Sequence, residues 1–335
     1  MHPSRARRPF PGRTLVALIA ALALLALASG CGVTRGSDDP NNRRLRMMIP
    51  NSVGGGYDLT GRAAARAMQD NHLTGRFKIT NVQGASGTVA MQRLLNEEGA
   101  DDLMMLMGLG VVGAVYTNKS EAKPLKMTPI ARLVEEQEGI LVPADSPFET
   151  LDDLVAAWKK DPAGLTVGGG SGNGGPDHLF PMQLADTIGV DPKKVNYISY
   201  DGGGPLTTAL LGAKIDVGMS GLGEFEDQIK DGKLRVLAVS GEERLDTVDA
   251  PTLTESGVDL VFTNWRGVLA PPGISEEQRD YLTGLLEKMH TTEEWKEALA
   301  ANGWTDNFAT GQEFEDFLAE QDARVADTLK ELGLA

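Results

Sequence analysis

The chain is poor in the residues that most catalytic and metal centres need. Cys31 is the only cysteine, so an internal disulfide is impossible and a thiol nucleophile or zinc site lacks supporting residues. The four histidines, His2, His72, His178 and His290, are too scattered to predict a metal site. No glycine loop continues into the Gly-Lys-Ser/Thr sequence of a nucleotide P-loop, and no serine lies in a Gly-x-Ser-x-Gly elbow. We therefore expect no metal, no cofactor and no catalytic residue.

An excess of basic charge is also missing. The formal net charge is −15, whereas a protein that binds nucleic acid needs a basic face to neutralise phosphates. Nucleic acid is therefore excluded as a partner. A small anionic ligand is not excluded, because distant surface charges are screened within about 10 Å while main-chain amides act locally. The length of 335 residues allows one large or two medium domains.

The first 30 residues have the composition of a secretion signal. A basic head precedes an apolar run over residues 15–28 that is too short to span a membrane comfortably. The sequence Leu-Ala-Ser-Gly-Cys at 27–31 resembles a bacterial lipobox, which predicts a lipid anchor on Cys31; the alternative is a free surface thiol. Residues 31–44 are polar and predict a flexible tether. We expect a protein attached to the outer face of the cell membrane, or a periplasmic one.

Glycine loops follow several predicted strands. The apolar run 45–49 leads into Gly54-Gly55-Gly56-Tyr57-Asp58 and then a helix over 59–68, with Asp58 placed as its N-cap. The same order recurs at 77–87, 165–188 and 195–204, and the strands at 215–219 and 234–239 end in Ser-Gly. Such loops expose N–H groups at helix starts, where negative groups bind. The alternation predicts an α/β fold, and its two clusters of loops predict two domains that face one ligand cleft.

The remaining segments are predicted from periodicity. Residues 103–109 are continuously apolar and predict a central parallel strand, and 130–134 and 139–142 predict two further strands. Thr150 is expected to cap a helix that ends near Lys160, and Ser275, Thr292 and Thr310 or Gly311 are expected to begin others. After Trp265 we expect helices that pack on the first domain, and no further sheet.

One glycine loop leaves an alternative open. Residues 170–175 match Gly-x-Gly-x-x-Gly after a strand and before a helix, and Asp201 ends the next strand, as a ribose-binding acid would. A dinucleotide site is therefore possible. In a run so rich in glycine, however, the match arises easily by chance, and an anion cradle is the preferred interpretation.

The mature chain resembles one family throughout, the extracytoplasmic solute-binding proteins of tripartite tricarboxylate transporters, also called the Bug family. The resemblance is carried, in this order and spacing, by Pro50 with Gly55 to Asp58 and Arg62, Asn81 to Gly87, Gly172 to His178, Tyr200-Asp201-Gly202, Gly212 with Asp216, Leu237-Ala238-Val239 with Arg244, Pro251-Thr252-Leu253 with Glu255, and Trp265-Arg266-Gly267 with Ala270 to Gly273.

The resemblance implies a two-domain periplasmic-binding-protein fold of class II, without enzyme activity. Domain 1 would comprise residues 45–140 and 265–335, and domain 2 residues 141–264. The protein would bind a small organic carboxylate, deliver it to the large and small membrane subunits of a transporter, and act as a monomer. The residues expected to bind the ligand are Gly55, Gly56, Tyr57, Asp58, Gln83, Ser86, Gly87, Ser171, Gly172, Asn173, His178, Tyr200, Asp201, Gly202 and Ser220.

The sequence departs from the family pattern at Asp201, a position that often holds lysine. The acid favours a ligand with an amine or several hydroxyl groups over a highly charged tricarboxylate. Two other functions stay open at this stage. One is an exported α/β enzyme that acts on a small organic acid, and the other is a sensory binding protein for a membrane kinase.

Overall fold

The computed structural model describes residues 43–334, so the predicted signal, Cys31 and most of the predicted tether lie outside the described residues. The strands are β1 (Leu45–Ile49), β2 (Phe77–Asn81), β3 (Leu103–Gly108), β4 (Thr128–Pro143), β5 (Thr166–Gly169), β6 (Asn196–Ser199), β7 (Val217–Gly221), β8 (Leu234–Val239), β9 (Thr263–Ala270) and β10 (Thr305–Thr310). The α-helices are α2 (Gly56–Asp70), α3 (Thr88–Asn96), α4 (Leu109–Thr117), α5 (Leu151–Lys160), α6 (Pro176–Thr187), α7 (Gly203–Leu211), α8 (Glu226–Lys230), α9 (Glu276–His290), α10 (Glu293–Asn302) and α11 (Gly311–Glu331). The predicted α/β alternation is confirmed.

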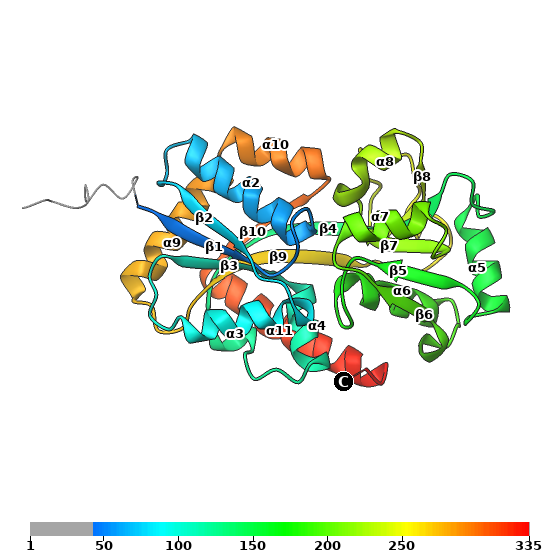
Figure 1. Ribbon diagram of the computed structural model, residues 1–335, viewed down its shortest axis with the longest axis horizontal. Coiled ribbons are helices and arrows are strands. Elements are labelled where there is room, and N and C mark those ends of the chain that lie inside the picture. The colour runs from blue at the N-terminus through cyan, green and yellow to red at the C-terminus, as the bar shows by residue number, and fades with distance from the viewer. Residues whose placement is uncertain (1–42, 335) are drawn as a thin grey trace, which may run out of the picture. The chain divides into compact units, whose positions relative to one another are not determined.

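The strands form one mixed sheet with the order β2-β1-β3-β9-β4-β7-β5-β6, while β8 and β10 also pair with β4 (Figure 1). Strands β2, β1 and β3 are parallel to one another, as are β7, β5 and β6. The antiparallel strands β9 and β4 join the two groups. We call β1, β2, β3, β9, β10 and residues 128–137 the first strand set, and β5 to β8 with residues 138–143 the second strand set.

Two expectations about strands were wrong. Residues 130–134 and 139–142 belong to one strand, β4, because the polar residues 135–138 between them also pair with neighbouring strands. Glu136 and Glu138 are buried there, 3% and 0% exposed, at the point where β4 passes from one strand set to the other. Sheet also continues after Trp265, since β9 runs to Ala270 and β10 pairs antiparallel with β4.

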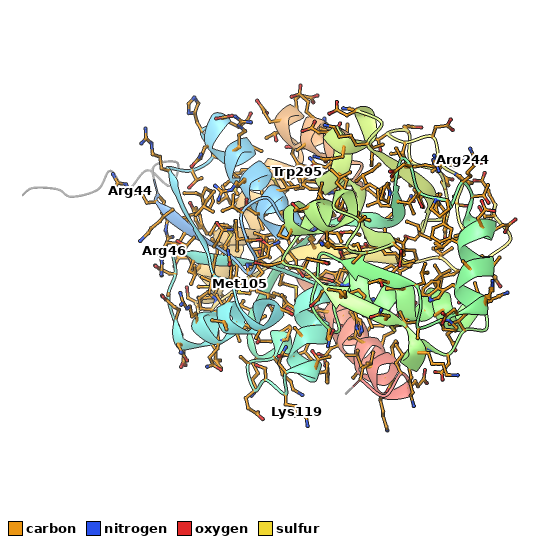
Figure 2. The ribbon with its side chains drawn as sticks, turned by 45° about the vertical axis from the view of Figure 1, so that its right-hand side comes forward. Arg44, Arg46, Met105, Lys119, Arg244 and Trp295 are labelled. Atoms are coloured by element: carbon orange, nitrogen blue, oxygen red, sulfur yellow. The ribbon has the colours of Figure 1, made fainter. Side chains whose placement is uncertain are left out.

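The helices cover both faces of the sheet (Figure 1). Helices α2, α9 and α10 enclose one core against the first strand set, whereas α3, α4, α6 and α11 share a core on the other face. Figure 2 labels one buried member of each core, Trp295 and Met105. The C-terminal helices thus pack on the first strand set, as expected, and they also pack on one another and on α2 and α4.

Most predicted helix starts are confirmed, with one correction. Thr150 and Asp153 form a complete capping box. The side chains of Ser275 and Thr292 each accept a hydrogen bond from the main-chain N–H three residues later. The N-cap of α2, however, is Gly55 and not Asp58. Asp58 lies inside the first turn and accepts the N–H of Gly54 at 2.9 Å, so it stabilises the loop before the helix.

Candidate functional site

A cavity of about 490 Å³ lies where the two strand sets meet. Its walls come from the loops that follow β1 and β2 on one side and β5, β6 and β7 on the other, completed by residues of α4 and β9. The lining residues are Pro50, Asn51, Gly56, Tyr57, Gln83, Gly84, Ala85, Ser86, Gly110, Gly170, Ser171, Gly172, Gly175, Pro176, Asp177, Ser199, Tyr200, Asp201, Ser220, Gly221, Glu224, Asn264 and Arg266. Segments far apart in sequence therefore meet at the carboxyl ends of parallel strands.

The structure brings most of the predicted site residues to this cavity. Those that line it are Gly56, Tyr57, Gln83, Ser86, Ser171, Gly172, Tyr200, Asp201 and Ser220. The others lie outside the lining, in the same loops or in the first turn of the helix that follows, and they are Gly55, Asp58, Gly87, Asn173, His178 and Gly202. Two of these, Asp58 and His178, hold the loops in place.

Asp58 fixes the first glycine loop. The carboxylate is 1% exposed and accepts hydrogen bonds at 2.9 Å from the Gly54 N–H, Arg62 Nε and Asn81 Nδ2. Burial acts to raise the pKa of Asp58, but the bonds from Arg62, Gly54 and Asn81 outweigh it and keep the pKa below its usual value. The loop is thus tied to α2 and to the end of β2.

His178 performs the same task for the second glycine loop. Its Nδ1 accepts the N–H of Gly174 at 3.0 Å, and its ring packs against Tyr197 with the centroids 4.7 Å apart. Burial lowers the pKa of His178 to about 4, so the ring is neutral at pH 7 and carries its proton on Nε2. The hydroxyl of Tyr197 donates to the Ser171 carbonyl at 2.6 Å and fixes the loop from the other end.

Two positions of the site require glycine because a neighbouring side chain lies too close for a Cβ atom. A Cβ on Gly56 would collide with the guanidinium of Arg266, and a Cβ on Gly172 would collide with the Ser86 hydroxyl from the opposite strand set. On that opposite side, Ala85 and Ser86 have φ values of 46° and 52°, a left-handed conformation that non-glycine residues rarely adopt. The loop is therefore strained next to the cavity, where such strain is often functional.

Tyr57 lines the cavity near the start of α4. The hydroxyl lies beside the main-chain N–H groups of Gly110 and Val111. Burial raises the pKa of Tyr57 to about 12, although the nearby Arg266 and these two amides oppose that shift. The phenol is therefore neutral and offers a hydrogen-bond donor.

Apart from Asp201, sequence reasoning missed the charged residues of the cavity, which are Arg266, Asp177 and Glu224. Arg266 on β9 is 4% exposed, forms an ion pair with Glu136 on β4, donates to Thr60 Oγ1 at 3.3 Å and faces the Trp304 ring. Asp177 and Glu224 line the second strand set's side. One signal was available, because an arginine within the apolar run of β9 is unusual for a buried strand.

Burial controls the ionisation of these acids. It raises the pKa of Glu224 to about 8, helped by the neighbouring charges of Asp177 and Glu136, while the N–H of Gly203 and the charge of Arg266 oppose the shift. Burial likewise raises the pKa of Asp177, against hydrogen bonds from Ser220 and from the Gly170 N–H at 2.7 Å. Glu138 has both carboxyl oxygens buried without a partner among the described residues, and burial holds its pKa well above the usual value.

Residues 43–334 contain neither a candidate membrane span nor a candidate metal site. No helix there is both long and apolar enough to cross a membrane. No group of three or more histidine, cysteine or acidic side chains in that part of the chain is arranged to hold a metal ion.

The chain is similar to known proteins in its family, its sequence and its fold. A family model described as the tripartite tricarboxylate transporter family receptor matches residues 61–334. A Cupriavidus necator protein described as "UPF0065 protein in gbd 5'region" is 29% identical over 334 residues, covering 98% of both chains. The crystal structure of a TctC solute-binding protein from Polaromonas, without ligand, is 28% identical with a TM-score of 0.63, covering 86% of this chain and 98% of that one. MatC from Rhodopseudomonas palustris, with bound malate, is 22% identical with a TM-score of 0.76, covering 86% and 99%. The fold is therefore that of periplasmic solute-binding proteins, as predicted.

Proposed function

Because the chain belongs to the tripartite tricarboxylate transporter receptor family, we propose that it captures a small carboxylate in the 490 Å³ cavity and delivers it to a membrane transporter. The observation that carries this proposal is the convergence of helix starts on one cavity. The first turns of α2, α4 and α6 all contribute to its lining, through Gly56, Gly110 and Pro176. Pro176 itself has no N–H, so α6 adds its helix dipole and not a donor from its first residue. Helix N-termini present free N–H groups and a partial positive charge, which favour a carboxylate.

We propose that the ligand carboxylate is held mainly by main-chain donors and by Arg266. Among the lining residues Arg266 is the one positively charged side chain. Hydrogen bonds to a charged group contribute about 1.5–3 kcal/mol each. Four or five of them approach the ~8 kcal/mol of a micromolar complex before the costs of ordering are subtracted. Ser86, Ser171 and Tyr57 would supply side-chain hydroxyls.

We further propose that the two strand sets are two lobes that close on the ligand. Residues 45–140 and 265–335 would form one lobe and residues 141–264 the other. Two hydrogen bonds between these parts support the closed arrangement: the Ser52 hydroxyl donates to the Asp201 carbonyl at 2.7 Å, and the Thr117 hydroxyl donates to the Asn173 carbonyl at 2.9 Å. A ligand that touches both sides would stabilise the closed form, which the large and small membrane subunits would recognise. In this proposal acylated Cys31 keeps the receptor, a monomer, on the outer face of the membrane.

The proposal is tested by thermal unfolding of the purified protein with di- and tricarboxylates, aromatic acids and amino acids. We expect at least one acid to raise Tm in a concentration-dependent way, because a ligand that binds only the folded state stabilises it. The same samples, analysed by mass spectrometry, should return the acid unchanged. No shift at millimolar concentrations contradicts the receptor, and chemical turnover supports the enzyme alternative instead.

A further inference from the structure

The cavity wall carries more acids than a site for a simple anion needs. Asp177, Asp201 and Glu224 line it, against Arg266 as the one cationic side chain in the lining. Glu136 and Glu138 are buried close by and contribute further negative charge to the surroundings of Glu224 and Asp177. An anion therefore binds beside this wall only where the carboxyl groups stay protonated, whereas a cationic group favours their ionised form.

The positive charge of Arg266 is largely matched within the protein. Glu136 pairs with its guanidinium from the neighbouring strand, and Thr60 Oγ1 accepts a second hydrogen bond. No lysine or histidine is among the residues that line the cavity. Asp177, Asp201 and Glu224 form no ion pair with a cationic side chain of that lining, since the ion pair of Arg266 is with Glu136.

Glu224 differs from Asp177 because one of its carboxyl oxygens accepts no hydrogen bond within residues 43–334. The Asp177 carboxylate is 5% exposed and is fixed by the Gly170 N–H and by Ser220. Glu224 accepts the Gly203 N–H through Oε2, while Oε1 has no hydrogen bond within residues 43–334. Oε1 lies beside Gly56 and Arg266, at the start of α2. It is thus a carboxyl oxygen of the cavity wall that is available to a ligand.

A second acceptor is unpartnered in the same wall. Asn264 lines the cavity two residues before Arg266 on β9, and the residue is 6% exposed. Its amide oxygen has no hydrogen-bond partner among the described residues. Buried polar atoms in native proteins are nearly always bonded, so an unpartnered acceptor at a cavity indicates a donor that arrives with the ligand.

We infer that the ligand of this cavity carries a protonated nitrogen in addition to its carboxylate, and that this nitrogen donates to Glu224. The inference rests on the proposed receptor function and specifies its ligand as a zwitterionic acid. The carboxylate would face the helix starts and Arg266, and the ammonium group would face the acid wall. The exposed Asp201 at the loop after β6 adds negative charge on the same side.

The ionisation of Glu224 provides a readout of this arrangement. The charged groups that face it are Asp177, Glu136, Glu138 and Arg266. Burial, helped by the charges of Asp177 and Glu136, raises the pKa of Glu224 to about 8, although Arg266 and the Gly203 N–H oppose the shift. Without ligand the carboxyl group is thus mostly protonated at pH 7. An ammonium group beside it favours the carboxylate and releases a proton, whereas a second carboxylate keeps it protonated and favours proton uptake.

The test compares acids that differ only in an amino group, by calorimetry at pH 7 in two buffers of different ionisation enthalpy. The pairs are aspartate and succinate, glutamate and glutarate, and 2-aminoadipate and adipate, with 6-aminohexanoate against hexanoate as a further pair. We expect the amino compound of at least one pair to bind tenfold or more tightly and to release protons. Glu224→Gln should abolish both effects, because Gln keeps an acceptor for Gly203 but cannot become negative.

Glu226→Gln is the matched control, since Glu226 pairs with Lys230 on α8 and does not line the cavity. It should leave the preference unchanged. If the diacid binds as tightly as its amino partner, or if the amino compound binds with proton uptake, the inference is overturned while the receptor function stands. If no member of any pair binds but another acid raises Tm in the thermal screen, the inference fails alone; if no acid of either experiment binds, both fail. A nitrogen-free acid released from the protein as isolated, identified by mass spectrometry, also overturns the inference alone.

Discussion

The hydroxyl of Ser52 donates to the main-chain carbonyl of Asp201 at 2.7 Å, although 149 residues separate the two in the chain. Ser52 belongs to the loop after β1, and Asp201 to the loop after β6. The bond therefore joins the first strand set to the second directly beside the cavity, where both loops meet. Such a contact can exist only while the two loops face each other.

Removing this bond should weaken the closed form. Ser52→Ala loses one neutral hydrogen bond, which contributes about 1 kcal/mol, so we expect ligand affinity to fall about fivefold, mainly through faster dissociation. Stopped-flow and calorimetry measure both quantities with any acid found in the screen. The matched control is Ser256→Ala, because Ser256 makes the same type of bond to the Thr252 carbonyl far from the cavity lining. Equal effects of the two substitutions would contradict the role of Ser52.

Asp58→Asn should destabilise the fold at neutral pH. The buried carboxylate accepts charged and neutral donors, and loss of its charge should cost about 2–3 kcal/mol in the free energy of unfolding. The pKa of Asp58 is lowered in the folded state, so its contribution is complete above the unfolded value of about 3.9 and is lost as pH falls through the folded value. Urea titrations at several pH values should show the gap between the two proteins closing in acid. Asp70→Asn, on the exposed end of the same helix, should show a much smaller gap.

Arg266→Met should be strongly destabilising. The substitution leaves Glu136 buried without its partner, a change that typically costs about 3–5 kcal/mol. The double variant Glu136→Gln with Arg266→Met should recover much of that loss in urea unfolding, because no unpaired charge remains. Ligand binding should be lost in both variants if Arg266 touches the carboxylate. Recovery of binding together with stability would assign Arg266 a purely structural role.

His178 should make the fold sensitive to mild acid. Its pKa is lowered to about 4, below the unfolded value of about 6.5, so the unfolded state binds more protons between these values. The free energy of unfolding should therefore fall as pH decreases from about 6.5 to 4, by up to about 3 kcal/mol in total. His178→Asn, whose amide oxygen can accept the Gly174 N–H, should flatten this slope. His72→Asn, at an exposed loop position, should leave it intact.

The helix boundaries show where reasoning from sequence succeeds. Thr150, Ser275 and Thr292 were assigned as caps because a cap depends on atoms three residues apart, and the structure has all three bonds. The glycine loops were found for a similar reason, since a sharp turn requires local backbone freedom. Asp58 marks the limit of this reasoning. It was assigned as a cap, but it bonds to Asn81 on another strand, and no local pattern reports that partner.

The sequence by itself determined the alternation of strands and helices, the glycine loops at their junctions and the family, because each of these depends on short patterns along the chain. The tertiary structure decided that β4 is continuous, that the polar segment of β10 pairs as a strand, and that Glu136 and Arg266 meet across 130 residues. It also decided which loop residues reach the cavity and which support it. These outcomes depend on the pairing of distant strands. Burial between such strands favours the protonated form of an acid, so the partner beside each acid decides whether it is ionised. A single sequence carries no record of which distant residues are paired.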